Sequence, residues 1–389
     1  MTAPREHRPA GRSGAHALLA GLLAAACAQM SAAAETEPSV ARLISQLGLV
    51  ESATPVREHP RWRPPRKIVL LGGAPREHLD AMTALAPSAE LVVVHDVESA
   101  AAAAVDADIV VGLTSYPGIC EPQIIEGARE LRWILAMSAG VERCVTVPAV
   151  RERGLLVTNL RAVDSAAIGE HVIALALALA RGIDTFVLNG ARARWSREDA
   201  QATRMQVLAG KTMLVVGLGG IGTEVAKRAH GIGMKVIATR ASGRGGPDFV
   251  SYVGTPDELH RLASGADVIV NTAPLTSQTQ GIFNRDFFSV LKPNAFFINV
   301  ARGGSVVTDD LVAALREGRI AGAGLDVVDP EPLPPEHPLW RAPNVIISPH
   351  VSAASDLPRE QRWLVARENL RRYVAGERML SVVDLEREY

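Results

Sequence analysis

The 389-residue sequence predicts an α/β protein made of two doubly wound parallel-sheet domains. Two series of short apolar segments alternate with longer helical patterns, one series before residue 165 and one after it. The segments are continuously apolar rather than alternating, which is typical of parallel strands buried between two layers of helices. Only 4% of the residues are aromatic, which suits close packing of helices against such sheets.

The first series predicts strands at Lys67–Leu71, Leu91–His95, Ile109–Leu113 and Trp133–Met137. The second predicts strands at Thr212–Val216, Lys235–Thr239, Val268–Thr272, Ala295–Asn299, Ala323–Val327 and Val345–Ser348. Between the two series, Ser165–Arg181 has no proline and predicts a long helix that Asp164 or Ser165 can cap. The tail Glu360–Ala375 predicts an amphipathic helix.

The tail helix follows the complete second series, so we expect it to return to the first domain. The prediction is one domain of residues 67–163 and 352–389, and a second of residues 164–351, with the two chain crossings as a hinge. Residues 35–66 are polar and end in a proline- and arginine-rich cluster. They predict a linker with one short helix around Val40–Leu47.

The first 34 residues have the pattern of a secretory signal peptide. Arg5, Arg8 and Arg12 precede an apolar run at Ala15–Cys27, and small residues follow at Ser31–Ala34. The apolar run is too short for a permanent membrane span. We therefore expect a periplasmic or secreted protein, cleaved after Ala34; the alternative is a disordered extension on a cytoplasmic one.

Charge and cysteine content exclude several classes of function. The formal net charge of −1 gives no basic excess for nucleic acid, so we expect no nucleic-acid partner. Of the three cysteines, Cys27 lies in the leader, and Cys120 and Cys144 show neither metal-ligand nor CxxC spacing. The sequence predicts no metal site and two ordinary buried cysteines, with a Cys120–Cys144 pair left open.

The strongest local signal is the glycine motif at residues 217–222. Gly217, Gly219 and Gly222 form a GxGxxG pattern that directly follows the Thr212–Val216 strand and opens a helix over Ile221–His230. The first glycine makes the tight turn, the second lets the backbone approach a pyrophosphate, and the third allows close helix–strand packing. The helix N-terminus offers N–H groups to the phosphates, so the motif predicts dinucleotide binding.

The end of the second strand in this unit indicates which dinucleotide is bound. A carboxylate usually stands there to bind the adenosine ribose. Here the strand ends at Thr239 and Arg240, and no carboxylate follows before Asp248. Arg240, with Ser242 and Arg244 as helpers, would attract a 2′-phosphate, so we expect NADP to be preferred over NAD. The alternative is that Arg240 is an ordinary surface arginine.

Three polar residues leave predicted strand ends of the second domain. Arg302 follows Ala295–Asn299, Glu331 lies beyond the next strand, and His350 ends the last one. The carboxyl ends of parallel strands face the ligand crevice. A histidine suits proton transfer near neutral pH, a carboxylate beside it orients the ring, and a guanidinium binds a carboxylate. Together they predict reduction of a 2-keto acid with His350, Glu331 and Arg302 as catalytic residues.

At these residues the chain resembles the D-isomer-specific 2-hydroxyacid dehydrogenase family. The matches are dense from about Leu131 to Val351. They are Met137–Glu142, Val157–Asn159, Gly169–His171, the glycine motif, Ala273–Thr276, Asn299–Gly304, Gly322–Glu331, His337–Trp340 and Ser348–His350. The resemblance implies an oxidoreductase with two Rossmann-like domains, an active site in the cleft between them, NAD(P) as cofactor and a homodimer.

The resemblance also implies roles for single residues. It assigns Arg302 to substrate binding and the His350–Glu331 pair to proton transfer. The backbone of Ala139 and Gly140 matches the loop that receives the substrate carboxylate. Asp326 matches the position that holds the nicotinamide carboxamide, and Ala273-Pro274 matches a loop over the cofactor. With the glycine motif and the end of the second strand, the expected cofactor residues are Gly217, Gly219, Gly220, Ile221, Gly222, Thr239, Arg240, Ala273, Pro274 and Asp326.

Departures from the family pattern indicate which cofactor and which branch of the family to expect. Arg240 stands where many members have Asp, as in the NADP-preferring glyoxylate and hydroxypyruvate reductases, and Val328 stands where Phe is common. Glu331 stands where the formate-oxidising branch has Gln, so that branch is not expected. The alternative from another class is a catalytically weak NAD(H)-binding regulator of the corepressor type. The substrate itself is not readable, because pocket residues lie in loops such as Thr114–Ile119.

Overall fold

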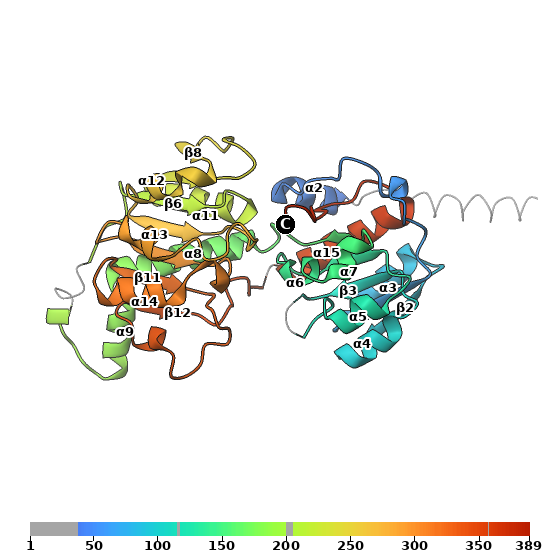
Figure 1. Ribbon diagram of the computed structural model, residues 1–389, viewed down its shortest axis with the longest axis horizontal. Helices are drawn as coiled ribbons and strands as arrows, with labels where there is room; N and C mark the ends of the chain where they lie inside the picture. The colour runs from blue at the N-terminus through green and yellow to red at the C-terminus, as the bar shows by residue number, and fades with distance from the viewer. Residues whose placement is uncertain (1–37, 115–116, 200–204, 357) are drawn as a thin grey trace, which may run out of the picture.

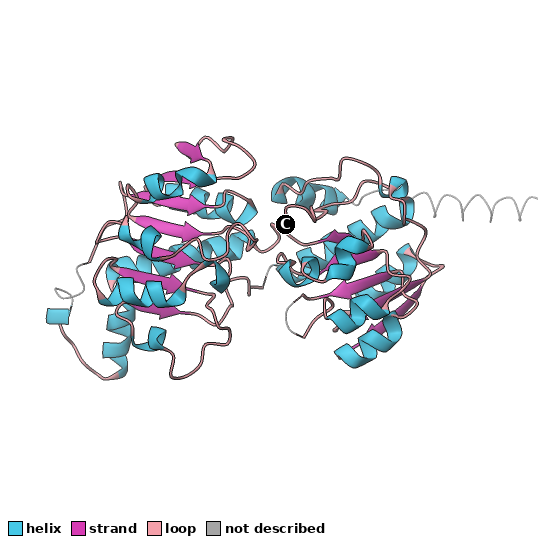
Figure 2. Ribbon diagram, in the orientation of Figure 1, coloured by secondary structure: helices cyan, strands magenta, loops and turns pink. Residues whose placement is uncertain are grey.

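The computed structural model describes residues 38–114, 117–199, 205–356 and 358–389. The predicted leader, residues 1–34, lies outside these ranges. The described chain forms two α/β domains side by side, each a parallel sheet with helices on both faces (Figures 1 and 2). The fold class predicted from the sequence is therefore confirmed, while the exact domain boundaries stay a prediction.

The first domain contains a five-stranded parallel sheet in the order β2-β1-β3-β4-β5. Its strands are β1 (Lys67–Leu71), β2 (Glu90–Val94), β3 (Ile109–Gly112), β4 (Trp133–Ala136) and β5 (Leu156–Thr158). Its helices are α2 (Pro38–Leu47), α3 (Arg76–Leu85), α4 (Val97–Ala104), α5 (Pro122–Gly127), α6 (Glu142–Val145), α7 (Pro148–Glu152) and α15 (Pro358–Ala375). Two apolar clusters, one on each face, form its core.

The second domain contains a seven-stranded parallel sheet in the order β12-β11-β10-β9-β6-β7-β8. Its strands are β6 (Thr212–Val216), β7 (Lys235–Thr239), β8 (Tyr252–Gly254), β9 (Val268–Asn271), β10 (Phe296–Asn299), β11 (Gly322–Leu325) and β12 (Val345–Ile347). Its α-helices are α8 (Ser165–Arg181), α9 (Ile183–Ala191), α11 (Gly220–Gly231), α12 (Leu259–Ala263), α13 (Arg285–Ser289) and α14 (Thr308–Arg316). The strand order reverses at β6, which is where ligands bind in open sheets.

All ten predicted strands are present, with ends that differ by at most two residues. The two strands that were not predicted, β5 and β8, have three residues each and lie at sheet edges. Runs this short give little periodic signal. The described chain also contains short 3-10 helices at Val56–Glu58, Pro256–Glu258, Gly303–Ser305 and Pro338–Arg341.

The first chain crossing is fixed by an ion pair. Helix α8 starts at Ser165 as predicted, but Asp164 makes no capping hydrogen bond. Instead its Oδ1 accepts from Nε and Nη2 of Arg362, on α15, at 3.0 and 2.9 Å. Burial raises the pKa of Asp164, and the charge and hydrogen bonds of Arg362 oppose that rise. The pair therefore ties the start of the second domain to the returning tail helix.

Helix α15 packs against α3 and α2 of the first domain, as expected for a returning tail. Buried His78 on α3 stacks on Trp363 with ring centroids 5.4 Å apart, and its Nε2 lies 3.1 Å from Oε2 of Glu360. Glu77 lies beside this pair, so three possible metal-ligand atoms fall within 4.8 Å of one another in the described chain. The ring stacking and the contact with Glu360 together account for the position of His78 between the two helices.

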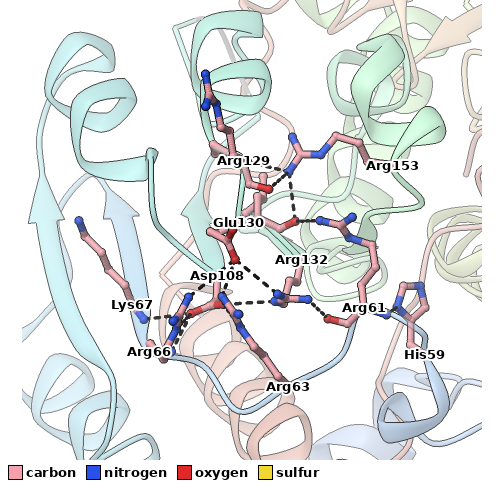
Figure 3. Close-up of polar contacts among 12 residues, drawn as sticks. His59, Arg61, Arg63, Arg66, Lys67, Asp108, Arg129, Glu130, Arg132 and Arg153 are labelled. Atoms are coloured by element: carbon pink, nitrogen blue, oxygen red, sulfur yellow. Dashed lines mark hydrogen bonds and ion pairs between the residues drawn. The ribbon is translucent and has the colours of Figure 1, made fainter.

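The segment predicted as a linker does not behave as one, although its predicted short helix is α2. Leu43, Leu49 and Val56 are buried in the core of the first domain. The arginine-rich cluster lies against the amino edge of the sheet, where Arg63 forms an ion pair with buried Asp108 at 2.7 Å (Figure 3). Trp62 Nε1 donates to the Tyr373 carbonyl at 2.9 Å. The segment is thus packed along the domain, which composition alone did not indicate.

The structure pairs Cys120 and Cys144 in a disulfide, with Cα atoms 4.8 Å apart. Both cysteines are buried. The expectation of two unpaired cysteines was therefore wrong, because the sheet order brings the loop after β3 beside α6, which follows β4. The bond links two segments at the carboxyl edge of the first sheet.

In the described part of the chain, no single helix is long and apolar enough to cross a membrane. The described helices α8 and α9 reach that length and apolar character only together, and they are bent by 75° at the break between them.

Candidate active site

The carboxyl edge of the second sheet carries the predicted catalytic residues. Arg302 follows β10, Asp326 follows β11, and His350 lies just after β12. These three strands are neighbours with parallel registers, so their ends meet at one edge. Glu331 lies in the loop that follows β11. The placement agrees with the prediction that the functional side chains gather at the ligand crevice.

His350 and Glu331 form a direct pair. His350 Nδ1 lies 2.7 Å from Oε1 of Glu331, and their side chains are 45% and 39% exposed. Because Glu331 occupies Nδ1, the Nε2 atom is the ring nitrogen left for proton exchange with a substrate. The backbone of His350 is left-handed, with φ of 53°, and its N–H donates to the Asp326 carbonyl at 2.8 Å.

The buried carboxylate of Asp326 holds the segment that carries His350. Its Oδ1 accepts from Ser348 Oγ at 2.7 Å and from the Val351 N–H at 2.9 Å, and its Oδ2 accepts from the Ser352 N–H at 2.9 Å. Burial would raise the pKa of Asp326, but the hydrogen bonds from Ser352, Ser348 and Val351 outweigh it and lower the pKa. The predicted contact with the nicotinamide carboxamide stays a prediction.

His171 was not given a role from the sequence. It lies on α8, and its Nε2 is 2.9 Å from Ser348 Oγ and 3.7 Å from Oδ1 of Asp326. Since Ser348 donates its hydroxyl proton to Asp326, its oxygen can accept from the His171 ring. The only sequence signal was the Gly169–His171 match to the family, which includes His171 but does not indicate its contact with Ser348.

Arg302 lies between the two domains. Its main-chain carbonyl accepts from Asn299 Nδ2 at 2.9 Å and Ser305 Oγ at 2.7 Å, which fixes the loop after β10. Its guanidinium forms an ion pair with Glu142 at the start of α6. The guanidinium lies directly over Gly140, where a Cβ would overlap it. Arg302 and the predicted substrate loop are therefore in contact.

The predicted substrate loop, Ala139-Gly140, is held in place by its neighbours. Asn159 Nδ2 donates to the Ala139 carbonyl at 2.7 Å, and Thr114 Oγ1 donates to the Gly140 carbonyl at 2.8 Å. Among the described residues no hydrogen bond or ion pair joins Arg302 to His350. A substrate between them would have to make that connection.

The glycine motif fits a dinucleotide. Gly217 has φ of 95°, and a Cβ there would lie 2.7 Å from the Ala273 backbone, while a Cβ at Gly222 would overlap the Gly217 carbonyl. Gly219 has no atom within 4 Å of its Cβ position, so its backbone is open to a ligand. Helix α11 begins at Gly220 and continues through Ile221, so its first N–H groups point to this opening.

The loop after β7 offers an arginine beside buried Thr239, the last residue of that strand. Arg240 is exposed; its Nε donates to Ser242 Oγ at 2.8 Å and its Nη1 donates to the Gly245 carbonyl at 3.1 Å. Arg244 instead pairs with Glu258 at 2.7 Å. The helper role predicted for Arg244 is therefore opposed by this contact, whereas Ser242 does lie beside Arg240.

Ala273 and Pro274, predicted to cover the cofactor, follow β9 at the same sheet edge. The Ala273 N–H donates to Oδ1 of Asn271 at 3.1 Å, and Thr279 Oγ1 donates to the Pro274 carbonyl at 2.6 Å. The loop lies against the turn at Gly217. The predicted cofactor residues thus lie along the carboxyl edge of the second sheet: the glycine turn, Thr239, Arg240, Ala273 and Pro274 are at its switch point, and Asp326 is at the end of β11.

Comparisons with known proteins identify the family of the chain. Residues 173–352 match the NAD binding domain of D-isomer specific 2-hydroxyacid dehydrogenases. The chain is 33% identical over 270 residues to glyoxylate reductase from Thermofilum pendens, covering 68% of this chain and 78% of that protein. It is 33% identical over 272 residues to human glyoxylate reductase/hydroxypyruvate reductase, covering 68% and 81%.

A solved structure shows the same fold. The NADPH-dependent glyoxylate/hydroxypyruvate reductase from Sinorhizobium meliloti, in complex with NADP and sulfate, superposes with a TM-score of 0.70 at 26% identity. The match covers 83% of this chain and 100% of that one. Fold, site and relatives define a two-domain nicotinamide-dependent dehydrogenase. The chain belongs to the D-isomer specific 2-hydroxyacid dehydrogenase family.

Replacing Asp326 by Asn should lower kcat about 10- to 100-fold, because the amide would turn a donor toward the Val351 and Ser352 N–H groups and shift His350. The free energy of unfolding gives a second signature. A folded pKa below about 3.9 means that the contribution of Asp326 is complete above that pH and is lost as the pH falls through the folded pKa.

Urea unfolding at pH 6 and pH 3 measures this contribution. The wild type should lose more stability between the two values than Asp326→Asn does. Equal losses, together with an unchanged kcat, would show that Asp326 does not hold the catalytic segment.

Proposed function

We propose that the chain reduces a small 2-keto acid to the matching D-2-hydroxy acid with NAD(P)H, as a glyoxylate/hydroxypyruvate-type reductase. The observation that carries this proposal is the His350–Glu331 pair, 2.7 Å apart, at the same sheet edge as the dinucleotide turn. The relatives named above are reductases, which supports this function over a nicotinamide-binding regulator.

Each catalytic residue then has a defined task. When bound, the reduced nicotinamide supplies a hydride for the carbonyl carbon of the substrate. His350 donates its Nε2 proton to the carbonyl oxygen as negative charge builds there, while Glu331 holds Nδ1 and stabilises the imidazolium. Arg302 binds the substrate carboxylate through its guanidinium fork, and the backbone of Ala139 and Gly140 is the proposed second binding element for the same group.

Turnover on a 2-keto acid panel tests this function. We expect NADPH consumption with at least one of glyoxylate, hydroxypyruvate, pyruvate and phenylpyruvate. His350→Ala should lower kcat by roughly 10²–10⁴-fold, because the proton donor is lost, while cofactor binding persists. His260→Ala, at an exposed histidine of α12, is the control and should retain activity.

The regulator alternative gives a different result on the same panel. It predicts cofactor binding without turnover of any 2-keto acid. A His350→Ala enzyme with near-normal kcat would also contradict the proposal, since His350 could not then be the proton donor.

The proposed cofactor preference is NADPH over NADH. It is supported by exposed Arg240 at the end of β7, with Ser242 bound to its Nε and no carboxylate on the strand end. A charge-assisted hydrogen bond contributes about 1.5–3 kcal/mol, or roughly a 10- to 150-fold preference in kcat/KM. Because the loop is exposed, solvent and salt screen the attraction between Arg240 and the 2′-phosphate, and the preference could fall to several-fold.

Arg240→Asp should reverse the preference, because it replaces attraction for the 2′-phosphate with repulsion. The measurement is kcat/KM for both cofactors in wild type and variant at moderate salt. Lys227→Asp, an exposed position on α11, changes the net charge equally and should keep the preference. A wild-type preference for NADH that Arg240→Asp leaves unchanged would rule out this role.

We infer that the protein works outside the cytoplasm, in the periplasm or as a secreted protein. Two independent features support this: the signal-like leader in residues 1–34 and the buried Cys120–Cys144 disulfide. Disulfides persist in oxidising compartments and are rare in the cytosol. The alternative is a cytoplasmic protein with an uncleaved extension and two free thiols.

Protein isolated from its native host should begin near Glu35 and contain no free thiol at Cys120 or Cys144. N-terminal sequencing and thiol titration of unreduced protein measure both properties. An intact Met1 or Thr2 terminus in a cytosolic fraction, with both thiols free, would contradict export and leave the proposed chemistry untouched.

We further propose a homodimer built on the second domain. Apolar side chains are exposed along α9 and in the segment that follows it: Ile183, Val187, Leu188 and Trp195, the last 91% exposed. Contiguous exposed apolar surface marks association sites in soluble proteins. Sedimentation analysis distinguishes the expected dimer from a monomer.

A further inference from the structure

An ion pair across the cleft holds the guanidinium of Arg302. Its Nε lies 3.2 Å from Oε1 of Glu142, and its Nη2 donates to Oε2 of Glu142 at 3.2 Å. The two contacts form a bidentate pair between a planar fork and a planar carboxylate. Arg302 belongs to the loop after β10 in the second domain, whereas Glu142 opens α6 in the first. The pair therefore forms only when the two domains approach each other.

The pair requires a residue without a side chain at position 140. Gly140 lies directly beneath Nη2 of Arg302, and any side chain there would displace the guanidinium. The Thr114 hydroxyl fixes the carbonyl of the same glycine. Glu142 and Arg302 side chains are only 26% and 31% exposed, so water screens their attraction incompletely. The contact thus lies against the loop that is proposed to receive the substrate carboxylate.

The pairing leaves one end of the guanidinium for a ligand. A guanidinium has five N–H donors in a fixed fork. Nε and one N–H of Nη2 face Glu142, and Nη1 donates to the Ala301 carbonyl at 2.6 Å. One N–H on each terminal nitrogen is not used by these contacts. That end can bind a carboxylate in a second bidentate contact.

We propose that Glu142 is a positioning residue for the reaction. From the opposite domain it sets the Arg302 fork so that its free end meets the carboxylate of the 2-keto acid. Arg302 is then correctly oriented only in the closed cleft, which couples domain closure to substrate binding. The inference rests on the proposed reductase function and adds to it the residue that prepares Arg302.

Glu142→Gln tests the proposal, because it keeps the size of the side chain and removes the charge. We expect KM for the 2-keto acid to rise about tenfold and kcat to fall several-fold, since one charge-assisted contact is lost in a partly exposed site. The dissociation constant for NADPH should not change. Glu142→Asp keeps the charge and should recover part of the loss. Glu121→Gln is the matched control, because Glu121 pairs with Arg143 instead.

A double-mutant cycle with Arg302→Lys separates positioning from general structure. If Glu142 acts through Arg302, Glu142→Gln should have little further effect on KM in the Arg302→Lys enzyme. Fully additive effects would overturn the proposal. A lowered KM in Glu142→Gln would overturn it too, because Glu142 would then compete with the substrate for Arg302.

Activity of the wild-type protein distinguishes failure of the proposed function from failure of the role proposed for Glu142. If wild-type protein reduces no 2-keto acid, the proposed function fails. If wild type is active and Glu142→Gln matches it in KM and kcat, only the role of Glu142 fails. Unchanged NADPH binding and thermal unfolding of the variant show that any loss of activity does not come from misfolding.

Discussion

The carboxylate of Asp326 is the interaction on which the catalytic edge depends. It accepts three hydrogen bonds from residues 348–352, and its own carbonyl holds the His350 N–H. His350 has a left-handed backbone, which costs about 1–2 kcal/mol and persists only where neighbours fix it. The position of the ring relative to Glu331 therefore follows from one buried carboxylate at the end of β11.

The two halves of the site differ in how they depend on the domain arrangement. The His350–Glu331 pair lies entirely within the second domain. The contact between Arg302 and Glu142 joins both domains, and the Asp164–Arg362 pair joins the two chain crossings. Changes in domain closure should thus affect binding of the substrate carboxylate more than the proton-transfer pair itself.

Much of this architecture could be predicted from sequence because it depends on local pattern. Buried parallel strands read as continuous apolar runs, and the polar residues that end them are carried to one edge by the topology. The glycine motif is likewise local. Arg302, Glu331 and His350 were found this way, and their positions in the structure match the expected sheet edge.

The features that were missed depend on contacts between distant segments. Cys120 and Cys144 are 24 residues apart with no recognisable spacing, yet the order of β3 and β4 brings them together. The supposed linker is packed by Arg63 on Asp108, a pair 45 residues apart. Glu142 and Arg302 are separated by 160 residues and lie in different domains. No period or propensity encodes such pairings.

The configuration of the product tests the central claim most directly. The family to which the chain belongs is specific for the D-isomer. Wild-type enzyme with NADPH and hydroxypyruvate or phenylpyruvate, followed by chiral chromatography of the 2-hydroxy acid, should give the D-isomer alone. A predominantly L or racemic product would contradict this account of the site.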